Sequence, residues 1–214
     1  ATNTGGSATT TVTIVVNDII PSSVTYSPNS FTLTKDSVMS ATTPTYNGGT
    51  VITWSVSPSL PAGLAFSTST GEISGTPTAV SSSATYTVTA TNTGGSATTT
   101  VTIVVNDIIP SSVTYSPNSF TLTKDSVMSA TTPTYNGGTV ITWAVDPSLP
   151  AGLAFSTSTG EISGTPTAVT SSATYTVTAT NTGGDATTTV TIVVNDIIPS
   201  SLSYSTSSFT LTKD

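Results

Sequence analysis

The side chains that most enzymes use for chemistry are nearly absent from this chain. It has no histidine and no cysteine, and charged residues make up only 6% of its 214 residues. The carboxylates are isolated along the sequence, so no nucleophile–base pair and no metal-activated water can be assembled from them. We therefore expect no catalytic residue, no cofactor-binding residue and no metal ligand, and we predict that the chain is not an enzyme.

Two lysines lie in the same short sequence, Thr-Lys-Asp, at positions 35 and 124. A lysine beside an asparagine and a buried acid can form an amide crosslink, as in some bacterial stalk domains, and Glu72 and Glu161 are the acids available on strands. The neighbouring aspartate and threonine favour a different interpretation, a solvated turn in which Lys35 and Lys124 keep their charged ends in water.

Aromatic residues are the remaining candidates for a binding site. Trp54 could serve as a platform for a sugar, but it lies at an inward position of a predicted strand, which favours a place in the core. Tyr46 and its equivalent Tyr135 are the candidates for an exposed site. A weak glycan or protein site in each copy would gain strength from avidity. A flat threonine-rich face is the simpler use of the same strands.

All of these residues recur because the sequence repeats itself. The segment Ala-Thr-Asn-Thr-Gly-Gly begins at positions 1, 90 and 179, which gives a period of 89 residues. Near-identity at a fixed period indicates a tandem array of one structural unit. Residues 1–89 and 90–178 differ at three positions, which are Ser55/Ala144, Ser57/Asp146 and Ser81/Thr170.

The repeat predicts where the domains begin and end. We expect two complete units and two partial ones, so that the chain is an internal window of a longer array. The predicted parts are 1–18, the last strand of a preceding repeat; 19–107, one repeat; 108–196, a second repeat; and 197–214, the first strand of a following repeat.

Composition limits the partners and the compartment. The formal net charge is −7, with three basic residues against ten acidic ones. This leaves no basic patch for nucleic acid or for an anionic membrane surface. The absence of cysteine, together with many serines and threonines, favours an exported bacterial or archaeal protein over an animal extracellular module held by disulfides. No transmembrane run or signal peptide is visible, so we expect no membrane insertion in this segment.

The pattern within one repeat is all β. Apolar and polar residues alternate in the manner of strands, and Asn-Gly or Gly-Gly sequences at 47–49 and 92–95, with Ser-Thr-Gly at 69–71, predict turns between them. About seven antiparallel strands in some 90 residues predict an immunoglobulin-like sandwich. The expected strands are 22–34, 37–46, 50–57, 63–67, 71–76, 83–91 and 96–106. The expected core is Tyr26, Phe31, Leu33, Ile52, Trp54, Val56, Leu60, Leu64, Phe66, Ile73, Tyr86, Val88, Val101 and Ile103.

One long run resembles a known family. It extends from Leu-Pro-Ala-Gly-Leu to Gly-Thr-Pro over residues 60–77, returns unchanged at 149–166, and is followed by a Tyr-Thr-Val-Thr-Ala-Thr-Asn strand and a Gly-Gly turn. The run is similar to the Putative Ig repeats of bacterial surface proteins, which are cadherin-like sandwiches related to the dystroglycan-type domain. The resemblance covers nearly the whole chain. It implies an exported array of β-sandwiches used in adhesins and surface stalks, without enzymatic activity.

The cadherin side of the resemblance implies calcium at domain junctions. Asn-Asp pairs precede each Ile-Ile-Pro junction, at 17–18, 106–107 and 195–196. Calcium takes six to eight oxygen ligands, several of them from carboxylates, and besides Asp107 one repeat offers only Asp125, Asp146 and Glu161. The shortfall favours the interpretation that Asn106 and Asp107 cap a strand and shape a turn, with a calcium junction as the alternative.

The linker completes the functional prediction. Pro110 restricts the backbone of a junction of seven residues, and we expect Ile108 and Ile109 to be buried there, which limits bending. The chain is thus interpreted as a spacer in a long cell-surface or extracellular fibre or adhesin, whose partners are neighbouring repeats of the same or like chains. The alternatives are a filament subunit joined by strand complementation through 1–18 and 197–214, and a multivalent glycan- or protein-binding module.

Overall fold

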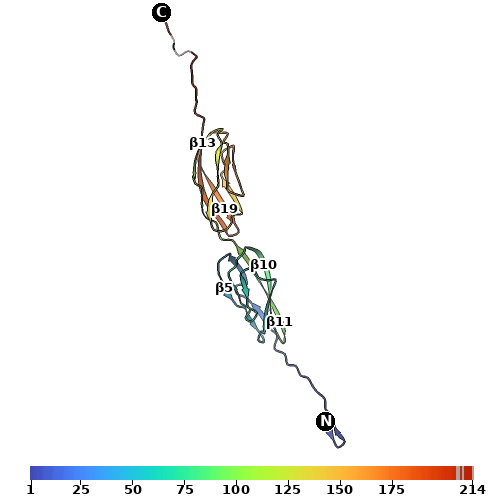
Figure 1. Ribbon diagram of the computed structural model, residues 1–214. Coiled ribbons are helices and arrows are strands. Elements are labelled where there is room, and N and C mark those ends of the chain that lie inside the picture. Colours follow the sequence, from blue (N-terminus) through green and yellow to red (C-terminus); the bar gives the residue numbers. More distant parts are fainter. Residues whose placement is uncertain (206–207, 209, 214) are drawn as a thin grey trace. The chain divides into compact units, whose positions relative to one another are not determined.

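The chain is built from strands and turns, as Figure 1 shows for the computed structural model. The structure describes residues 1–205, 208 and 210–213; the other four positions fall in the predicted segment 197–214 and lie outside the described residues. The chain divides into two compact units between Asp107 and Ile108. Within the described ranges no helix is long and apolar enough to cross a membrane. The predicted all-β class is confirmed.

Both repeats are described throughout, and each contains nine strands. In the first repeat they are β3 (Ser22–Thr25), β4 (Ser30–Thr34), β5 (Met39–Thr42), β6 (Thr45–Asn47), β7 (Thr53–Ser57), β8 (Leu64–Phe66), β9 (Ile73–Gly75), β10 (Ser81–Asn92) and β11 (Gly95–Asn106). In the second they are β12 (Ser111–Thr114), β13 (Ser119–Thr123), β14 (Met128–Thr131), β15 (Thr134–Asn136), β16 (Thr142–Asp146), β17 (Leu153–Phe155), β18 (Ile162–Gly164), β19 (Thr170–Asn181) and β20 (Gly184–Asn195). A short hairpin, β1 (Thr2–Asn3) and β2 (Gly6–Ser7), precedes them.

The strands of each repeat form a sandwich. One layer is a four-stranded sheet in the order β4-β11-β10-β7, and the rest of the repeat forms a three-stranded sheet, β5-β9-β8, and a two-stranded sheet, β3-β6. The second repeat has the same orders, β13-β20-β19-β16, β14-β18-β17 and β12-β15. Most neighbours are antiparallel, but β4 runs parallel to β11, and β13 runs parallel to β20. The first strand of the large sheet is therefore bonded directly to the last strand of the repeat.

Two predicted strands are each divided by a proline, which raises the number from about seven to nine. The predicted strand 22–34 becomes β3 and β4, which belong to different sheets, with Pro28 between them. The predicted strand 37–46 becomes β5 and β6, separated at Pro44. Proline has no N–H to donate to a ladder, so a strand ends or changes sheet at such a position.

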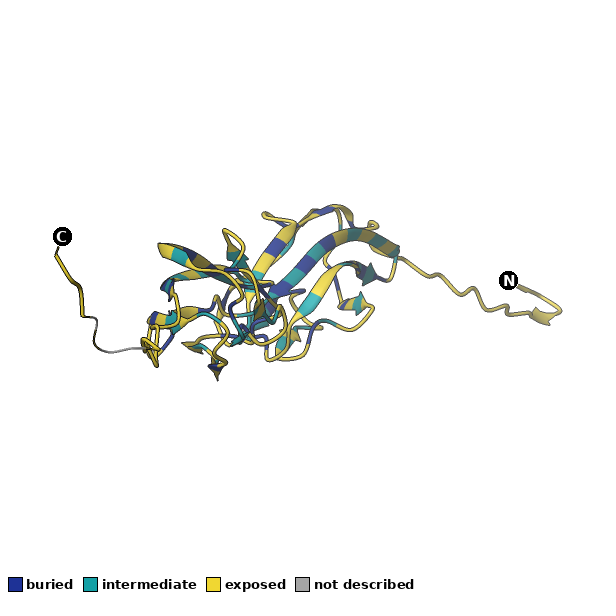
Figure 2. Cartoon of the chain, turned by 90° about the horizontal axis from the view of Figure 1, so that it is seen from above, coloured by how far each residue is buried: buried dark blue, intermediate teal, exposed yellow. Residues whose placement is uncertain are grey.

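The core follows the predicted two-residue period on the long strands. Val101, Ile103 and Val105 are fully buried on β11, and Figure 2 shows buried segments alternating with more exposed ones along the long strands. The predicted burial of Ile52 is wrong. This residue precedes β7, its N–H donates to the carbonyl of Thr91 at 2.8 Å, and its side chain is 56% exposed.

The rest of the predicted core is buried or half-buried, with Leu33, Val56, Leu60, Leu64 and Phe66 in the half-buried group. Val24, Met39 and Val51 are buried core residues that the strand pattern did not predict. Among the buried side chains, the Tyr26 hydroxyl donates a hydrogen bond to the carbonyl of Gly71. Burial raises the pKa of Tyr26 to about 12, and it also raises the pKa of the equivalent Tyr115.

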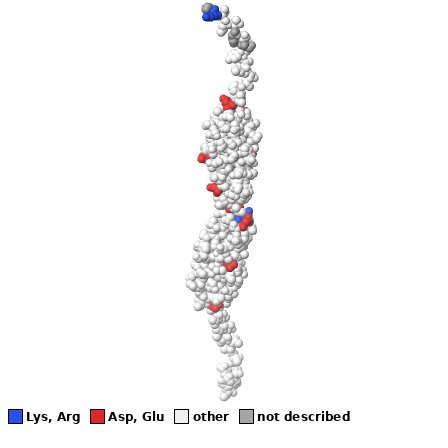
Figure 3. All heavy atoms as spheres, turned by 90° about the vertical axis from the view of Figure 1, so that its left-hand side faces the viewer, with Lys and Arg blue, Asp and Glu red and all other residues white. Residues whose placement is uncertain are grey.

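The outer face of the four-stranded sheet is rich in hydroxyl groups. Threonine stands opposite threonine across β10 and β11, as in the pairs Thr87/Thr100 and Thr89/Thr98. Acidic and basic side chains are few on the face seen in Figure 3. The alternation that buries valine and isoleucine inside the sandwich thus leaves mainly serine and threonine on the outside. In the second repeat Asp146 and Asp185 also lie on this outer face.

Candidate functional site

The segment that leads into each repeat is fastened to that repeat by a buried asparagine. We call residues 18–21 and their equivalents 107–110 the entering segment. Asn92 ends β10, and only 7% of its surface is exposed. Its Nδ2 donates to the carbonyl of Ile19 at 2.7 Å, and its Oδ1 accepts from the N–H groups of Gly94 at 2.9 Å and Gly95 at 3.2 Å. One side chain therefore holds both the β10–β11 turn and the incoming backbone.

The backbone of the entering segment fits closely against glycines. The N–H of Gly49 gives the Ile19 carbonyl a second hydrogen bond, at 3.0 Å. A Cβ atom on Gly94 would lie 2.0 Å from the carbonyl oxygen of Asp18, and one on Gly48, whose φ is +90°, would lie 2.3 Å from that of Ile20. Glycine is required where backbone approaches backbone this closely.

Asp18 adds contacts to the same turn. Its N–H donates to Oγ1 of Thr93 at 3.0 Å, and that hydroxyl donates to the Asp18 carboxylate at 3.3 Å. These bonds cross 75 residues of sequence. The carboxylate of Asp18, one of the possible calcium ligands at the junctions, thus accepts a hydrogen bond from the turn at 92–95. Within the described parts of the chain, no three carboxylates gather into a group that could hold a metal ion.

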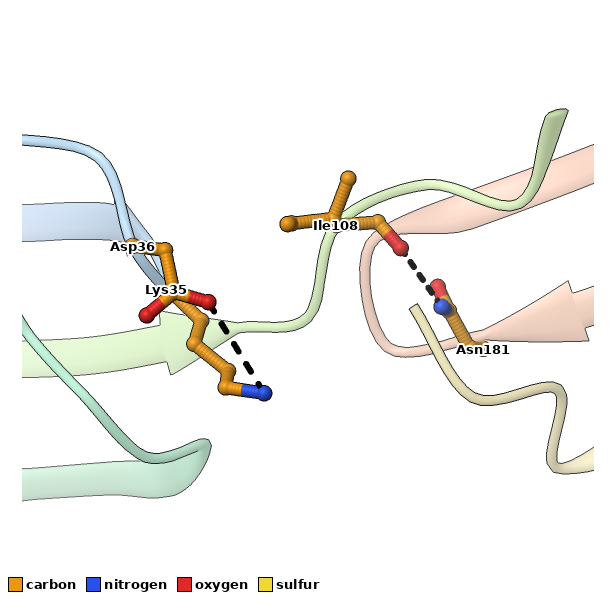
Figure 4. A network of polar contacts seen from close by, with 4 residues as sticks. All are labelled: Lys35, Asp36, Ile108 and Asn181. Carbon is orange, nitrogen blue, oxygen red and sulfur yellow. Dashed lines mark hydrogen bonds and ion pairs between the residues drawn. The ribbon is translucent and has the colours of Figure 1, made fainter. Parts of the chain in front are cut away.

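The second repeat uses the same arrangement. Asn181 is 6% exposed, and its Nδ2 donates to the carbonyl of Ile108 at 2.7 Å, as the close-up in Figure 4 shows. The N–H of Gly138 donates to the same carbonyl at 3.0 Å, and the N–H of Gly183 donates to Oδ1 of Asn181 at 2.8 Å. Both repeats therefore bind their entering segment through the same asparagine contact.

The isoleucines of the entering segment are not buried as expected. Ile108 is 40% exposed and Ile109 is 51% exposed, as is Ile20 in the first repeat. The following proline is buried instead: Pro21 and Pro110 both lie inside. Backbone hydrogen bonds and the buried proline ring hold the entering segment in place, and its isoleucine side chains stay at the surface.

The two lysines for which a crosslink was the less favoured interpretation lie at the surface. Nζ of Lys35 is 3.9 Å from the carboxylate of Asp36, and the two side chains are 35% and 56% exposed (Figure 4). Lys124 and Asp125 form the same pair at 3.9 Å. These ion-paired, solvated ends differ from the lysine beside a buried acid that an amide crosslink needs.

The aromatic candidates form one edge-to-face pair in each repeat. The ring of Tyr46 meets the ring of Trp54 edge to face, with centroids 5.6 Å apart and an angle of 68°. Trp54 is buried, as predicted, whereas Tyr46 is 38% exposed. Tyr135 and Trp143 repeat the arrangement at 5.7 Å. Tyr46 therefore covers the core tryptophan with one side of its ring.

The sequence identified the turn at 92–95 but not the role of the asparagine in it. Its side chain bonds to a residue 73 positions away. The available signal was the joint recurrence of Asn-Thr-Gly-Gly and Asn-Asp-Ile-Ile-Pro at the same spacing in both repeats.

Both repeats belong to one known domain family. The sequence profile of the Putative Ig domain family matches residues 12–106 and 110–195. The chain belongs to this family, as the resemblance indicated, and consists of tandem immunoglobulin-like domains. No curated protein sequence matches the chain.

Several solved structures have a similar fold, and tandem Ig domains are among them. The N-terminal eight Ig domains of Down Syndrome Cell Adhesion Molecule (DSCAM) isoform 1.30.30 match with a TM-score of 0.51 and 15% identity over 85% of this chain and 27% of that one. The N-terminal four Ig domains of Dscam1 isoform 9.44 match with a TM-score of 0.51 and 14% identity over 86% and 48%. Drosophila OTK extracellular domains 3–5 match with a TM-score of 0.49 and 19% identity over 80% and 62%. The chain thus spans less than two thirds of each of these three structures. At these identities the two matches with a TM-score of 0.51 show the fold alone.

Proposed function

We propose that the chain is a load-bearing spacer in a long extracellular or cell-surface fibre of a bacterium or archaeon. The observation that carries this proposal is the parallel pairing of β4 with β11. Five residue pairs join them, from Ser30/Thr102 to Thr34/Asn106. Because the two strands are parallel and lie near opposite ends of the repeat's sequence, tension along the chain pulls them past one another. All of their hydrogen bonds are then loaded together.

The entering segment supports the same role. Tension that reaches a repeat from its N-terminal side meets the bonds of Asn92 and Gly49 to the Ile19 carbonyl before it meets β4. Asn92, which binds this carbonyl, is the last residue of β10, and the turn after it leads into β11. The C-terminal end of β11 is the end of the repeat. Load can therefore pass through the two longest strands of the domain.

We also propose that the repeats span 19–107 and 108–196, and that 1–18 and 197–214 belong to neighbouring repeats. The division of internal contacts between Asp107 and Ile108 supports this boundary. Residues 1–18 have the same sequence as 90–107, which form the end of β10 and all of β11. In this proposal the partners of each repeat are its neighbours in the same chain and like chains beside it.

Stretching single molecules tests the load-bearing role. An unfolding repeat of 89 residues should release about 300 Å of chain at roughly 3.3–3.6 Å per residue. The N–H of Thr102 donates to the Asn29 carbonyl, so even-numbered residues of β11 face β4. Val104→Pro removes one such donor and should lower the unfolding force of the first repeat alone.

Thr98→Pro is the matched control, because residue 98 lies on the same strand and faces the same way but beyond the residues that pair with β4. It should leave the force nearly unchanged. Equal forces for Val104→Pro and Thr98→Pro would contradict the proposal, because the β4–β11 pair would then carry no load.

A further inference from the structure

The open edge of the four-stranded sheet offers a surface for a second copy of the chain. β4 and β7 are the two edge strands of this sheet. The β7 edge is covered, because the N–H of Trp54 donates to the carbonyl of Thr68 at 2.9 Å, and Trp143 does the same with Thr157 at 2.8 Å. A loop thus occupies one edge of the sheet in both repeats, and β4 forms the other edge.

Half of the N–H and C=O groups of β4 point away from β11, its neighbour in the sheet. The carbonyl of Asn29 and the N–H of Lys35 bond to β11, which places the odd-numbered residues toward that strand. Ser30 and Thr32 therefore direct their N–H and C=O groups to the open side. Unpaired groups of this kind are a template for another strand, and proteins commonly block them with lysine, proline or a bulge. Residues 30–34, Ser-Phe-Thr-Leu-Thr, contain none of these.

A hollow lies beside this edge in both repeats. In the first repeat it has a volume of about 330 Å³ between β4 and β5 and is lined in part by Phe31, Leu33, Val38 and Met39. The second repeat has an equivalent hollow of about 340 Å³. No charged residue is among those that line either one. At the rim, Val38 is 78% exposed and Val127 is 79% exposed.

We propose that β4 pairs with β4 of a second copy, in antiparallel orientation about Thr32, and that β13 can do the same about Thr121. The edge is complementary to itself, because each Thr32 offers one donor and one acceptor to the other. Its lack of charge matters in a chain of net charge −7, since the pairing brings no like charges together. Exposed Val38 would move from water toward the apolar surface of the joined edges.

The proposed contact between two chains should be weak. One pair of five-residue edges buries much less than the roughly 1,200–2,000 Å² of a stable protein interface. The two-repeat chain should therefore dimerise weakly, and strength would come from many repeats acting together. Association between stalks is separate from bearing load within one stalk, so either property can fail without the other.

Cysteine scanning provides the sharpest test, because the chain has no cysteine of its own. In the proposed pair the two Cα atoms of residue 32 lie about 5.5 Å apart, which is within the range of a disulfide. The full chain with Thr32→Cys, oxidised with diamide, should form covalent dimers at least ten times faster than the chain with Thr87→Cys. Thr87 is a matched control, since it is exposed on the same outer face but on the inner strand β10.

Charge substitution gives an independent measurement. Thr32→Lys with Thr121→Lys places like charges opposite each other at the proposed pairs and should abolish concentration-dependent dimerisation in sedimentation. Thr87→Lys with Thr176→Lys makes the same change of charge on inner strands and should leave it intact. Equal crosslinking at positions 32 and 87, a chain that stays monomeric up to about 1 mM, or equal effects of the two lysine pairs would each overturn the proposal.

Discussion

Replacing Asn92 by alanine tests the role of the entering segment most directly. The substitution removes three hydrogen bonds at a site that is 7% exposed: one to the Ile19 carbonyl and two from the N–H groups of Gly94 and Gly95. The Ile19 carbonyl keeps its bond from Gly49, and Gly95 keeps its place opposite Asn92 in the β10–β11 ladder, but the N–H of Gly94 loses its acceptor.

A buried group left without a partner costs about 1–3 kcal/mol. One such group at this half-buried turn, together with the lost hydrogen bond to the Ile19 carbonyl at about 0.5–1.5 kcal/mol, predicts a loss of about 2–3 kcal/mol for Asn92→Ala. In a domain of this size 1 kcal/mol shifts the melting temperature by roughly 4–8 °C. The first repeat should therefore melt roughly 10–20 °C lower.

Differential scanning calorimetry of the full chain measures this with an internal reference. The first repeat should melt in a separate, earlier transition while the second keeps its own, and Asn181→Ala should reverse the assignment. Asn47→Ala, at an exposed position in the other Asn-Gly turn, is the control and should cost less than about 0.5 kcal/mol. If Asn92→Ala melts within about 3 °C of the unaltered chain, the asparagine does not fasten the entering segment.

Three further predictions concern Tyr26, calcium and Tyr46. Burial raises the pKa of Tyr26 to about 12 from its usual value near 10, so between these pH values the folded state keeps a proton that the unfolded state loses. The melting temperature should therefore fall as the pH rises from 10 to 12. Tyr26→Phe with Tyr115→Phe should make this fall smaller. Exchanging EDTA for millimolar calcium should move the melting temperature by less than about 1 °C, because the described carboxylates do not cluster; a rise of several degrees would favour the calcium junction. Tyr46→Ala should cost about 1 kcal/mol, since its ring packs on Trp54, while glycan-array binding stays unchanged; a loss of binding would favour the multivalent module.

The long strands could be predicted from sequence because their period is local. Alternating valine or isoleucine with threonine predicted 83–91 and 96–106, which the structure extends only slightly to Ser81–Asn92 and Gly95–Asn106. The same rule failed for Ile52, where β7 begins one residue later and the side chain turns outward. A pattern of alternation gives the facing of a strand only if the strand continues to that residue.

Pairings between residues far apart in the sequence could not be predicted from local patterns. Pro28 marks a break, but the sequence does not say that β4 crosses to the other sheet and lies parallel to β11. The turn at Asn92 was predicted from the tolerance of asparagine and glycine for turn geometry, whereas its partner lies 73 residues away. Such pairings depend on how whole sheets are placed, which a local pattern does not contain.

Each repeat contains both its entering segment and the turn that binds this segment. This has a consequence for how such arrays change length during evolution. The segment before β3 is held by the β10–β11 turn of the same repeat, and β4 pairs with β11 of the same repeat. A duplication or deletion of 89 codons between two near-identical copies therefore inserts or removes a unit together with its fastening. Every junction that remains keeps the same sequence and the same contacts. Recombination can then change the length of the array in whole repeats, without any compensating mutation.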